Sequence, residues 1–292
     1  MPRSSESNQA YKAIPADAFT FDQLAPLYNE TRVDYIVPMP MTGRRLAEYV
    51  HDYDISLSAS AVIVNSKRHA VGLTMIGLRG DRAWATRLGV LPQHRGHKVG
   101  QFLMENLIQR SREHNTRRVQ LEVIKGNEPA MQLFLKLGFV PMRELLIIRR
   151  PPGPPPAQLQ PAGVIVSELG SSSIESCLAQ RDEAALAWTE ETPSLLRTGG
   201  LRGLTATLPS GESGWVIFQH SPFQLLHLVL GPGSGDEMTQ ALLYSVHQQF
   251  SLHDTKVENL PSDHKTWPTF QRLGYMEVFR RVEMYLSLLP SS

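Results

Sequence analysis

The spacing of hydrophobic and polar residues predicts an alternation of strands and helices over the first half of the chain. Apolar runs bounded by turn residues predict strands, and apolar residues at helical spacing predict helices. The segment from Arg32 to Thr42 contains Pro38 and Pro40, so it is predicted to be a loop. The predicted strands cover residues 11–18, 60–65, 70–78 and 82–91, and the predicted helices cover residues 20–28 and 43–50.

The stretch from Leu88 to Gly100 is the most informative part of this pattern. A strand runs into a basic loop that contains Gly96, and a helix follows at once. Such a loop directs several backbone N–H groups at one point, where the positive end of the helix dipole adds to them. The pattern predicts a site for a phosphate or a pyrophosphate, and the alternative is a surface turn before an ordinary helix. The apolar face of the helix comprises Val99, Phe102, Leu103 and Leu107.

A second strand–helix segment follows closely. Apolar residues alternate with Gln120 and Glu122, which predicts a strand over residues 119–123. Asn127 suits the N-cap of a helix, and Pro129 suits its first turn. Gly138 stands where a glycine commonly ends a helix. One face of this helix is formed by Ala130, Leu133, Phe134 and Leu137.

Together these two segments resemble the two motifs of the GNAT acyltransferase superfamily. The first fits V-x-P-x-x-R-G-x-G-x-G, and the second fits L-E-V-x-x-x-N-x-x-A-x-x-L-[YF]-x-x-x-G-F, in the right order and at the right spacing. The resemblance covers roughly residues 10–150. It implies an α/β (α+β) fold with a mixed, mostly antiparallel central sheet flanked by helices. Lys98 stands in place of the usual middle glycine of the first motif, and Phe134 in place of a tyrosine that often acts as general acid.

The resemblance also implies an acetyl-CoA site, and the sequence contains no CxxC or HExxH pattern that would predict a metal site. Main-chain groups near Leu88, Gly89 and Val90 would pair with the pantetheine arm. Asn127 would lie beside that arm, although it also serves as a helix cap. The residues expected to contact the cofactor elsewhere, mostly around the pyrophosphate, are Arg95, Gly96, His97, Lys98, Val99, Gly100, Gln101 and Phe134.

Acetyl transfer to an amine requires a base, and Glu122 is the candidate. The strand before the first motif lacks a carboxylate between Trp84 and Leu88. Glu122 matches a glutamate that serves as base in the ribosomal-protein acetyltransferases of this superfamily. The alternative is a structural glutamate paired with an arginine on a neighbouring strand. Phe134 cannot donate a proton, so the leaving thiolate would be protonated by water, by a tyrosine such as Tyr35 or Tyr53, or by solvent.

The acceptor side is expected to involve the loop over residues 32–42. In the superfamily this loop borders the acceptor cleft, which makes Tyr35, Met39 and Met41 candidate contacts. Arg87 is a candidate for binding a carboxylate or phosphate of the acceptor, and a salt bridge within the sheet is the alternative. The acceptor is expected to be a small-molecule amine or a peptide.

The second half of the chain repeats the first in weakened form. Phe270, Leu273, Gly274 and Tyr275 match four residues of the first half at a constant offset of 136. The loop before the corresponding helix lacks Arg and Lys, and Asp236 and Glu237 follow it. A proline-rich stretch separates the halves, as a spacer or as a ligand of an SH3-type domain. The predicted organisation is a flexible segment 1–10, a cofactor-binding domain 11–150, a linker 151–163 and a degenerate GNAT-like copy 164–292.

Composition narrows the class of protein further. The net charge of +1 across 292 residues provides no field to recruit nucleic acid or membranes. The single cysteine, Cys177, and the polar N-terminus are typical of a cytoplasmic protein. The sequence predicts an acetyl-CoA-dependent N-acetyltransferase that acts by direct transfer on a primary amine, as a monomer with an internal pseudo-dimer or as a homodimer. The alternatives are a non-catalytic acyl-CoA-binding or sensory module and a protein N-acetyltransferase.

Overall fold

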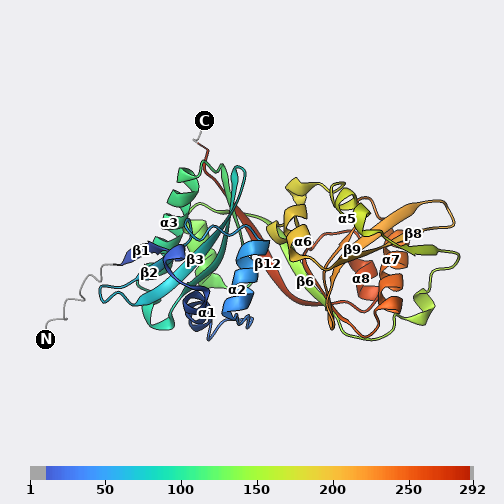
Figure 1. Ribbon diagram of the computed structural model, residues 1–292, viewed down its shortest axis with the longest axis horizontal. Coiled ribbons are helices and arrows are strands. Elements are labelled where there is room, and N and C mark those ends of the chain that lie inside the picture. The colour runs from blue at the N-terminus through green and yellow to red at the C-terminus, as the bar shows by residue number, and fades with distance from the viewer. Residues whose placement is uncertain (1–10, 290–292) are drawn as a thin grey trace. The chain divides into compact units, whose positions relative to one another are not determined.

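The computed structural model describes residues 11–289, which divide into two compact units (Figure 1). Unit 1 comprises the residues up to Met142 and those from Glu283 onward, and unit 2 comprises Arg143–Val282. The segment 1–10, predicted to be flexible, lies outside the described residues. Each unit is built around a mixed, mostly antiparallel sheet flanked by helices, as predicted.

Unit 1 contains the elements predicted for the first half of the chain, except that residues 16–18, predicted to belong to the first strand, form a 3-10 turn. Its strands lie in the order β1-β2-β3-β4-β5, with the last residues of β12 beyond β5; the pairs from β1 to β4 are antiparallel, and β4 and β5 are parallel. The strands are β1 (Lys12–Pro15), β2 (Ala61–Val64), β3 (Ala70–Arg79), β4 (Arg82–Val90), β5 (Arg118–Ile124) and the end of β12 (Met276–Ser287). The helices are α1 (Phe21–Glu30), α2 (Gly43–Asp52), α3 (Val99–Glu113) and α4 (Glu128–Lys136), with short 3-10 turns η1 (Ala16–Ala18) and η2 (Pro92–His94).

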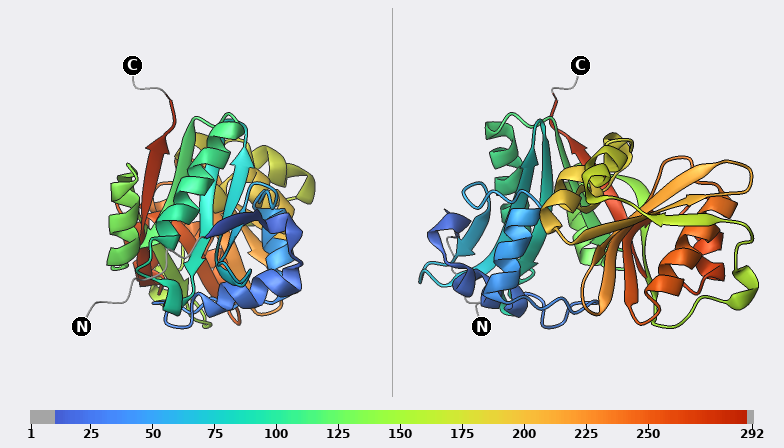
Figure 2. Two further views of the ribbon diagram at one scale, coloured as in Figure 1. Left: turned by 90° about the vertical axis from the view of Figure 1, so that its left-hand side faces the viewer. Right: turned by 45° about the vertical axis from the view of Figure 1, so that its right-hand side comes forward.

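The helices of unit 1 lie on both faces of its sheet (Figure 2). Two neighbouring residues of β4 show this, because successive side chains of a strand point to opposite faces. A Cβ atom on Gly89 would meet Thr31, just after α1, whereas Val90 lies beside Gly100 in the first turn of α3. The two helix layers therefore meet the sheet at the end of β4, where the predicted phosphate loop begins.

Local capping explains where the helices of unit 1 begin. Thr20 and Gln23 form a capping box at the start of α1, and the Thr42 side chain accepts a hydrogen bond from the Arg45 backbone at the start of α2. Asn127 caps α4 by accepting from the Ala130 N–H. Gly138 ends the α4 segment with a φ of +89°. The predicted helix starts are confirmed at these positions.

Unit 2 has the same kind of sheet. The C-terminal part of β6 (Val140–Arg150) lies next to β11, and the order continues β11-β10-β9-β8-β7, with β10 and β11 parallel. The strands are β7 (Ile165–Glu168), β8 (Leu201–Thr207), β9 (Ser213–His220), β10 (Gln224–Leu230) and β11 (Asp254–Pro261). The helices are α5 (Ser171–Leu178), α6 (Thr192–Thr198), α7 (Asp236–Gln249) and α8 (Trp267–Arg272), with η3 (Ala157–Leu159), η4 (Glu183–Ala185) and η5 (Trp188–Glu190).

The two units exchange the ends of their last strands. Strand β6 begins after α4, but its residues from Leu145 to Arg150 pair with β11 of unit 2. Strand β12 begins in unit 2 and ends in unit 1, where the Leu288 N–H donates to the Arg117 carbonyl. The observed boundaries between the units therefore differ from the predicted boundary, which lay between residues 150 and 164. The reason is that each half of the chain completes its sheet with a strand from the other half.

The predicted linker is packed onto unit 2. The buried Arg150 side chain donates hydrogen bonds to the carbonyls of Pro151, Gly153 and Pro154. It also donates to the Leu273 carbonyl, and Leu159 packs against the hydrophobic core of unit 2. A buried guanidinium needs acceptors for its donors, and the backbone of this proline-rich segment supplies them.

The repeat predicted from the sequence has a structural counterpart. At the offset of 136, β5, α4 and β6 correspond to β11, α8 and β12, and Gly138 corresponds to Gly274, which has a φ of +91°. A further shared feature is a bulge in the strand before the helix. It places Arg87 of β4 at a φ of +53° and His227 of β10 at a φ of +50°.

Candidate functional site

The loop before α3 contains two residues in the left-handed conformation and leads into a helix without a side-chain cap. Gly96 and Lys98 adopt the left-handed conformation, with φ of +77° and +62°. Helix α3 has no side-chain cap at Lys98, and the first N–H groups of a helix have no intrahelical acceptor. Alternating left-handed residues before an uncapped helix form a concave site for an anion. This is the geometry expected of a pyrophosphate cradle.

Lys98 keeps the backbone conformation for which glycine is usual at that position of the motif. A left-handed φ costs a non-glycine residue about 1–2 kcal/mol. The Lys98 side chain is exposed and adds a positive charge beside the loop. The departure from the family pattern is therefore compatible with the loop geometry.

Arg95 ties the loop to the segment that follows α1. Its guanidinium binds both carboxylate oxygens of Asp34, at 2.6 and 2.8 Å, and donates to the Thr31 carbonyl at 3.0 Å. The hydrogen bond to Arg95 holds the pKa of Asp34 below its usual value. The Arg95 N–H donates to the Pro92 carbonyl, so this backbone donor is already used within the loop.

Arginine side chains donate hydrogen bonds to the backbone of β4 along the edge beside this loop. The Leu91 N–H donates to the Val71 carbonyl of β3, which places the hydrogen-bonding groups of Val90 and Leu88 on the other edge. There the Leu88 carbonyl accepts from Arg32 at 3.3 Å and the Val90 carbonyl accepts from Arg95 at 3.1 Å. The parallel pairing of β4 with β5 is registered only up to Trp84 and Gln120, before this edge begins.

Other predicted cofactor residues have local partners. The His97 ring bonds the Arg95 carbonyl at 2.9 Å, and Gln101 accepts from Lys136 of α4 at 2.9 Å. A Cβ on Gly100 would make ordinary contacts with Leu133 and Val90. Phe134 is 6% exposed and lies 5.8 Å, centroid to centroid, from the ring of Phe139. Phe134 is therefore a core residue without a proton to donate.

Glu122 lies on the face of β5 that it shares with Trp84 of β4. The Trp84 Nε1 donates to Glu122 Oε2 at 2.8 Å. Trp84 lies 6.1 Å from the Tyr49 ring and 6.0 Å from the Tyr53 ring, measured between centroids. Burial raises the pKa of Tyr49 to about 12, against the opposing charge of Arg87. Glu122 thus lies beside an aromatic cluster whose buried phenol stays protonated at neutral pH.

The bulge in β4 directs Arg87 toward the same aromatic cluster. Its guanidinium carbon is 4.0 Å from the centroid of Tyr49, and its Nη1 donates to the Tyr28 hydroxyl at 3.0 Å. Sequence reasoning missed the bulge itself, because it depends on the register of β4 against β3.

The predicted acceptor loop is held by side chains of α1 and of the turn after it. The Asn29 amide bonds both the N–H and the carbonyl of Met41, each at 2.8 Å. The Arg32 guanidinium lies 4.1 Å from the centroid of Tyr35. Met39 is half-buried on the same loop.

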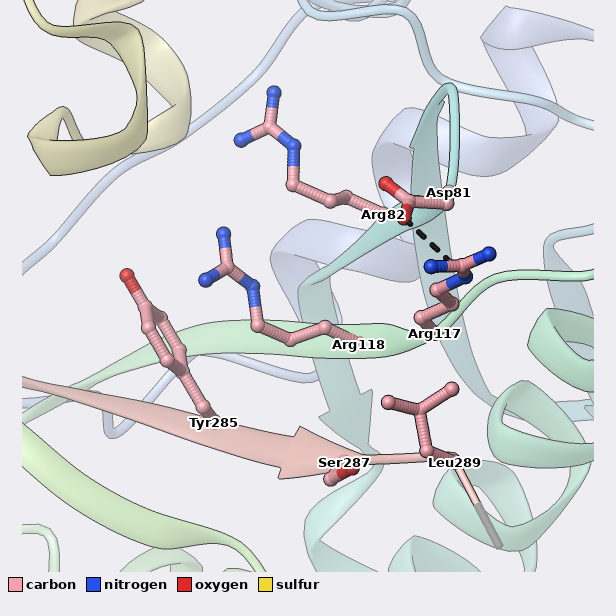
Figure 3. A pocket seen from close by; sticks show the side chains of 7 residues that line it. All are labelled: Asp81, Arg82, Arg117, Arg118, Tyr285, Ser287 and Leu289. Carbon is pink, nitrogen blue, oxygen red and sulfur yellow. Dashed lines mark ion pairs between the residues drawn. The ribbon is translucent and has the colours of Figure 1, made fainter.

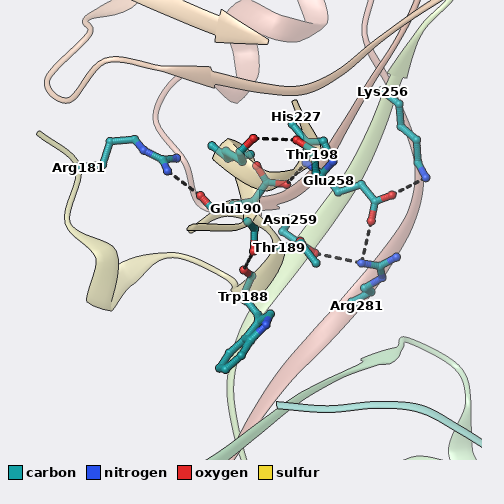
Figure 4. A network of polar contacts seen from close by, with 12 residues as sticks. Arg181, Trp188, Thr189, Glu190, Thr198, His227, Lys256, Glu258, Asn259 and Arg281 are labelled. Atoms are coloured by element: carbon teal, nitrogen blue, oxygen red, sulfur yellow. Dashed lines mark hydrogen bonds and ion pairs between the residues drawn. The ribbon is translucent and has the colours of Figure 1, made fainter. Parts of the chain in front are cut away.

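The corresponding position of unit 2 is occupied by ion pairs (Figure 4). Glu258, at the offset of 136 from Glu122, bonds Lys256 at 2.5 Å and Arg281 at 3.0 Å. Burial alone would raise the pKa of Glu258, but these two cations hold it far below its usual value. His227, at the bulge, lies 3.4 Å from Glu190. The carboxylate equivalent to Glu122 is thus neutralised by its own unit.

The start of α7 in unit 2 also differs from the start of α3. Its first turn carries Asp236 and Glu237, and Asp236 accepts a hydrogen bond from Thr269 at 2.7 Å. These carboxylates complement the positive end of the helix. They place negative charge where the loop of unit 1 would hold a phosphate.

A cavity of about 440 Å³ lies at the other end of β4 and β5 in unit 1 (Figure 3). Both strands begin there, whereas the phosphate loop follows the end of β4. Sequence reasoning did not single out this position. The cavity is lined by Asp81, Arg82, Arg117, Arg118, Tyr285, Ser287 and Leu289.

Residues 11–289 contain neither a cluster of metal-binding side chains nor a helix that could span a membrane. No group of three or more His, Cys, Asp or Glu side chains in this range is arranged to hold a metal ion. No helix in the same range is long and apolar enough to cross a membrane.

Comparisons with known proteins show which family part of the chain resembles. Residues 24–139 match the acetyltransferase (GNAT) family. A Bacillus subtilis (strain 168) protein named "putative ribosomal protein bS18-alanine N-acetyltransferase" is 30% identical over 83 residues. These residues are 28% of this chain, and they span about half, 55%, of that relative.

Solved structures extend the similarity of fold to the whole chain. A GCN5-related N-acetyltransferase from Sphaerobacter thermophilus is 16% identical, with 97% of each chain covered and a TM-score of 0.72. A tandem GNAT protein of the clavulanic acid biosynthesis pathway is 15% identical, with 98% of this chain and 100% of the other covered and a TM-score of 0.63. The fold is that of GNAT proteins, and residues 24–139 match the acetyltransferase (GNAT) family.

Proposed function

We propose that the protein is an acetyl-CoA-dependent N-acetyltransferase that transfers acetyl directly to a primary amine of a small molecule. The observation that carries this proposal is the uncapped start of α3 behind the left-handed Gly96 and Lys98. A helix start without its own cap favours an anionic ligand, and the pyrophosphate of CoA is such a ligand. The exposed edge of β4 beside it suits the amides of a pantetheine arm.

Binding would proceed by exchange of hydrogen bonds along β4. The pyrophosphate would take the N–H groups from Gly96 to Gln101. The pantetheine amides would replace the side chains of Arg32 and Arg95 at the carbonyls of Leu88 and Val90. Asn127 would remain the cap of α4 and lie beside the arm.

Transfer would then use Glu122 as the base. The amine nitrogen attacks the thioester carbonyl carbon, Glu122 takes a proton from the nitrogen directly or through water, and the C–S bond breaks. The Trp84 indole, bonded to Oε2, holds the Glu122 carboxylate in place. The thiolate takes its proton from solvent, since Phe134 has no hydroxyl group. Positioning supplies most of the rate, because well-oriented reactants gain roughly 7–11 kcal/mol.

The proposal assigns one cofactor site to each chain, in unit 1. Unit 2 would be a degenerate copy, because Asp236 and Glu237 lie at the start of its helix and Glu258 is neutralised. Titration calorimetry with acetyl-CoA should give a stoichiometry near one.

The test pairs two glycines of similar conformation. Gly96 and Gly80 have φ of +77° and +54°, and a Cβ on either would meet no atom within 4 Å. Gly96→Val and Gly80→Val should therefore lower stability to a similar extent, by about 1–2 kcal/mol. Only Gly96→Val should abolish acetyl-CoA binding, and binding that survives this change would refute the proposed site.

The activity itself is tested by release of free thiol from acetyl-CoA with a panel of amines. The panel includes peptides with an N-terminal alanine, since the relative from B. subtilis is named for that acceptor. Phe134 is buried and has no proton to donate to the leaving thiolate, which favours one alternative, a non-catalytic acyl-CoA-binding module. Acetyl-CoA binding without thiol release across the panel would support that alternative.

A further inference from the structure

The cavity at the start of β4 and β5 carries an excess of positive charge. Three arginines line it, against the single carboxylate of Asp81. Arg117 lies 3.7 Å from Asp81. Arg82 and Arg118 are register partners on adjacent parallel strands, so their side chains share one face of the sheet. Figure 3 shows these two side chains extending in the same direction.

Arg118 is built into the cavity wall with donor capacity remaining. Its guanidinium lies 4.3 Å from the centroid of Tyr285, and stacking leaves the in-plane N–H groups able to donate. Its Nε is buried and has no hydrogen-bond partner among residues 11–289. Guanidinium groups bind carboxylates and phosphates preferentially.

A polar stripe connects this cavity with Glu122. Residues 118, 120 and 122 lie on one face of β5. Gln120 is 1% exposed, and in the part of the chain that the structure describes neither atom of its amide has a partner. Protein covers this amide, so the geometric link between the cavity and Glu122 is the shared face of β5. The Cα atoms of Arg118 and Glu122 are about 13 Å apart along the strand.

We propose that the arginine-lined cavity binds an acidic group of the acceptor while the amine at its other end meets Glu122. The acceptor class is then a long primary amine with a carboxylate or a phosphate about 13 Å away. This inference rests on the proposed function for the role of Glu122. The anion site itself rests on the cavity and on Arg118.

The test uses tetrapeptide amides as rulers. Ala-Gly-Gly-Glu amide places a carboxylate about 13 Å from the amine when extended. Ala-Gly-Gly-Gln amide removes the charge, Ala-Glu-Gly-Gly amide moves it close to the amine, and Ala-Gly-Gly-phosphoserine amide exchanges carboxylate for phosphate. Thiol release should show a KM about 10- to 100-fold lower for a distant acid than for the Gln peptide. Whichever distant acid gives the lower KM identifies the anion.

Variants of the full chain assign the effect to the cavity. Arg118→Gln should remove the preference for the distant acid, and Arg118→Lys should retain part of it. Arg44→Gln, which removes the same charge from a side chain that is 87% exposed on α2, should leave the preference unchanged. If Arg118→Gln fails to fold, Leu289→Glu provides a second route, because Leu289 is 56% exposed and its replacement adds a competing carboxylate.

Two readouts separate this inference from the proposed function. Calorimetry measures binding of the four peptides without acetyl-CoA, and thiol release measures turnover. Acid-dependent binding without turnover would support the cavity and refute the transferase. Turnover with equal KM for the Glu and Gln peptides, or an acid preference that survives both Arg118→Gln and Leu289→Glu, would overturn the cavity as an acceptor site.

Discussion

At the scale of single residues, Gly89 sets how closely the chain after α1 approaches β4. A Cβ at this position would lie 2.1 Å from Thr31 Oγ1 and 2.7 Å from Thr31 Cβ. Thr31 also accepts from Arg95 through its carbonyl, so the close approach holds the segment to which the phosphate loop is tied. A side chain at residue 89 would push this segment away from the site.

Gly89→Ala is therefore expected to destabilise unit 1 by about 1–3 kcal/mol, the usual cost of overpacking. Urea unfolding measures the loss, and Gly100→Ala, whose new Cβ makes ordinary contacts, is the control. Thr31→Ala combined with Gly89→Ala should recover part of the loss. Equal stability of Gly89→Ala and the wild-type protein would contradict the close contact between Gly89 and Thr31.

Glu122 is the second residue whose role a single substitution decides. Glu122→Gln retains the shape and an acceptor for the Trp84 indole but removes the base. We expect kcat to fall by about 10²- to 10⁴-fold, with the Kd for acetyl-CoA unchanged. Glu113→Gln, at the far end of α3, is the matched control. A normal rate for Glu122→Gln at every pH would leave this glutamate with a structural role only.

At the scale of elements, α7 is joined to the segment before β12 by a buried hydrogen bond. His247 Nε2 and the Tyr275 hydroxyl are 2.8 Å apart, and both residues are buried. Burial, with a contribution from the charge of Arg150, lowers the pKa of His247 to about 3. The folded protein therefore keeps this imidazole neutral at pH values where the unfolded chain protonates it.

This difference predicts a loss of stability in acid. Because the folded pKa is lowered, the contribution is present above about pH 6.5 and is lost as the pH falls toward 3, by about 1.4 kcal/mol per pH unit. His247→Gln should remove this slope, so that its stability falls less between pH 7 and pH 5. Urea unfolding at both pH values measures the slopes. His114→Gln, on the surface, should retain the wild-type slope, and an unchanged slope in His247→Gln would contradict the assignment.

At the scale of the whole molecule, the exchange of strand ends makes each unit depend on the other half of the chain. Four consecutive residues of β6 are fully buried, and this stretch pairs with β11, which belongs to the second half of the chain; they are Leu145, Leu146, Ile147 and Ile148. Residues 283–289 in turn belong to unit 1. Neither half of the sequence contains a complete unit.

A chain that ends at Gln158 is accordingly expected to aggregate or to bind acetyl-CoA weakly. It would expose the buried stretch of β6 and lose the strand beyond β5. Size-exclusion chromatography and calorimetry measure both effects, and adding residues 159–292 as a separate chain should restore binding in part. A soluble, monomeric first half that binds acetyl-CoA as tightly as the full chain would show that the exchange is dispensable.

The sequence by itself determined the features that depend on neighbouring residues. The caps at Thr20, Thr42 and Asn127, the glycine at residue 138 and the loop–helix motif are all local, because each involves residues a few positions apart. The two motifs carried the family resemblance that implied the fold class, and matching residues gave the offset of 136 between the halves. The roles of the individual site residues remain proposals that the experiments above address.

Only the tertiary structure decided what depends on distant contacts. Arg95 meets Asp34 across 61 positions of sequence, and the bulge at Arg87 depends on the register of β4 against β3. The sequence of the proline-rich segment predicts a linker, whereas in the structure the buried Arg150 donates hydrogen bonds to its carbonyls. Strand exchange leaves no local signal, because β6 and β12 have the same pattern whichever sheet they complete. In each case the partner is chosen by packing, which no single stretch of sequence contains.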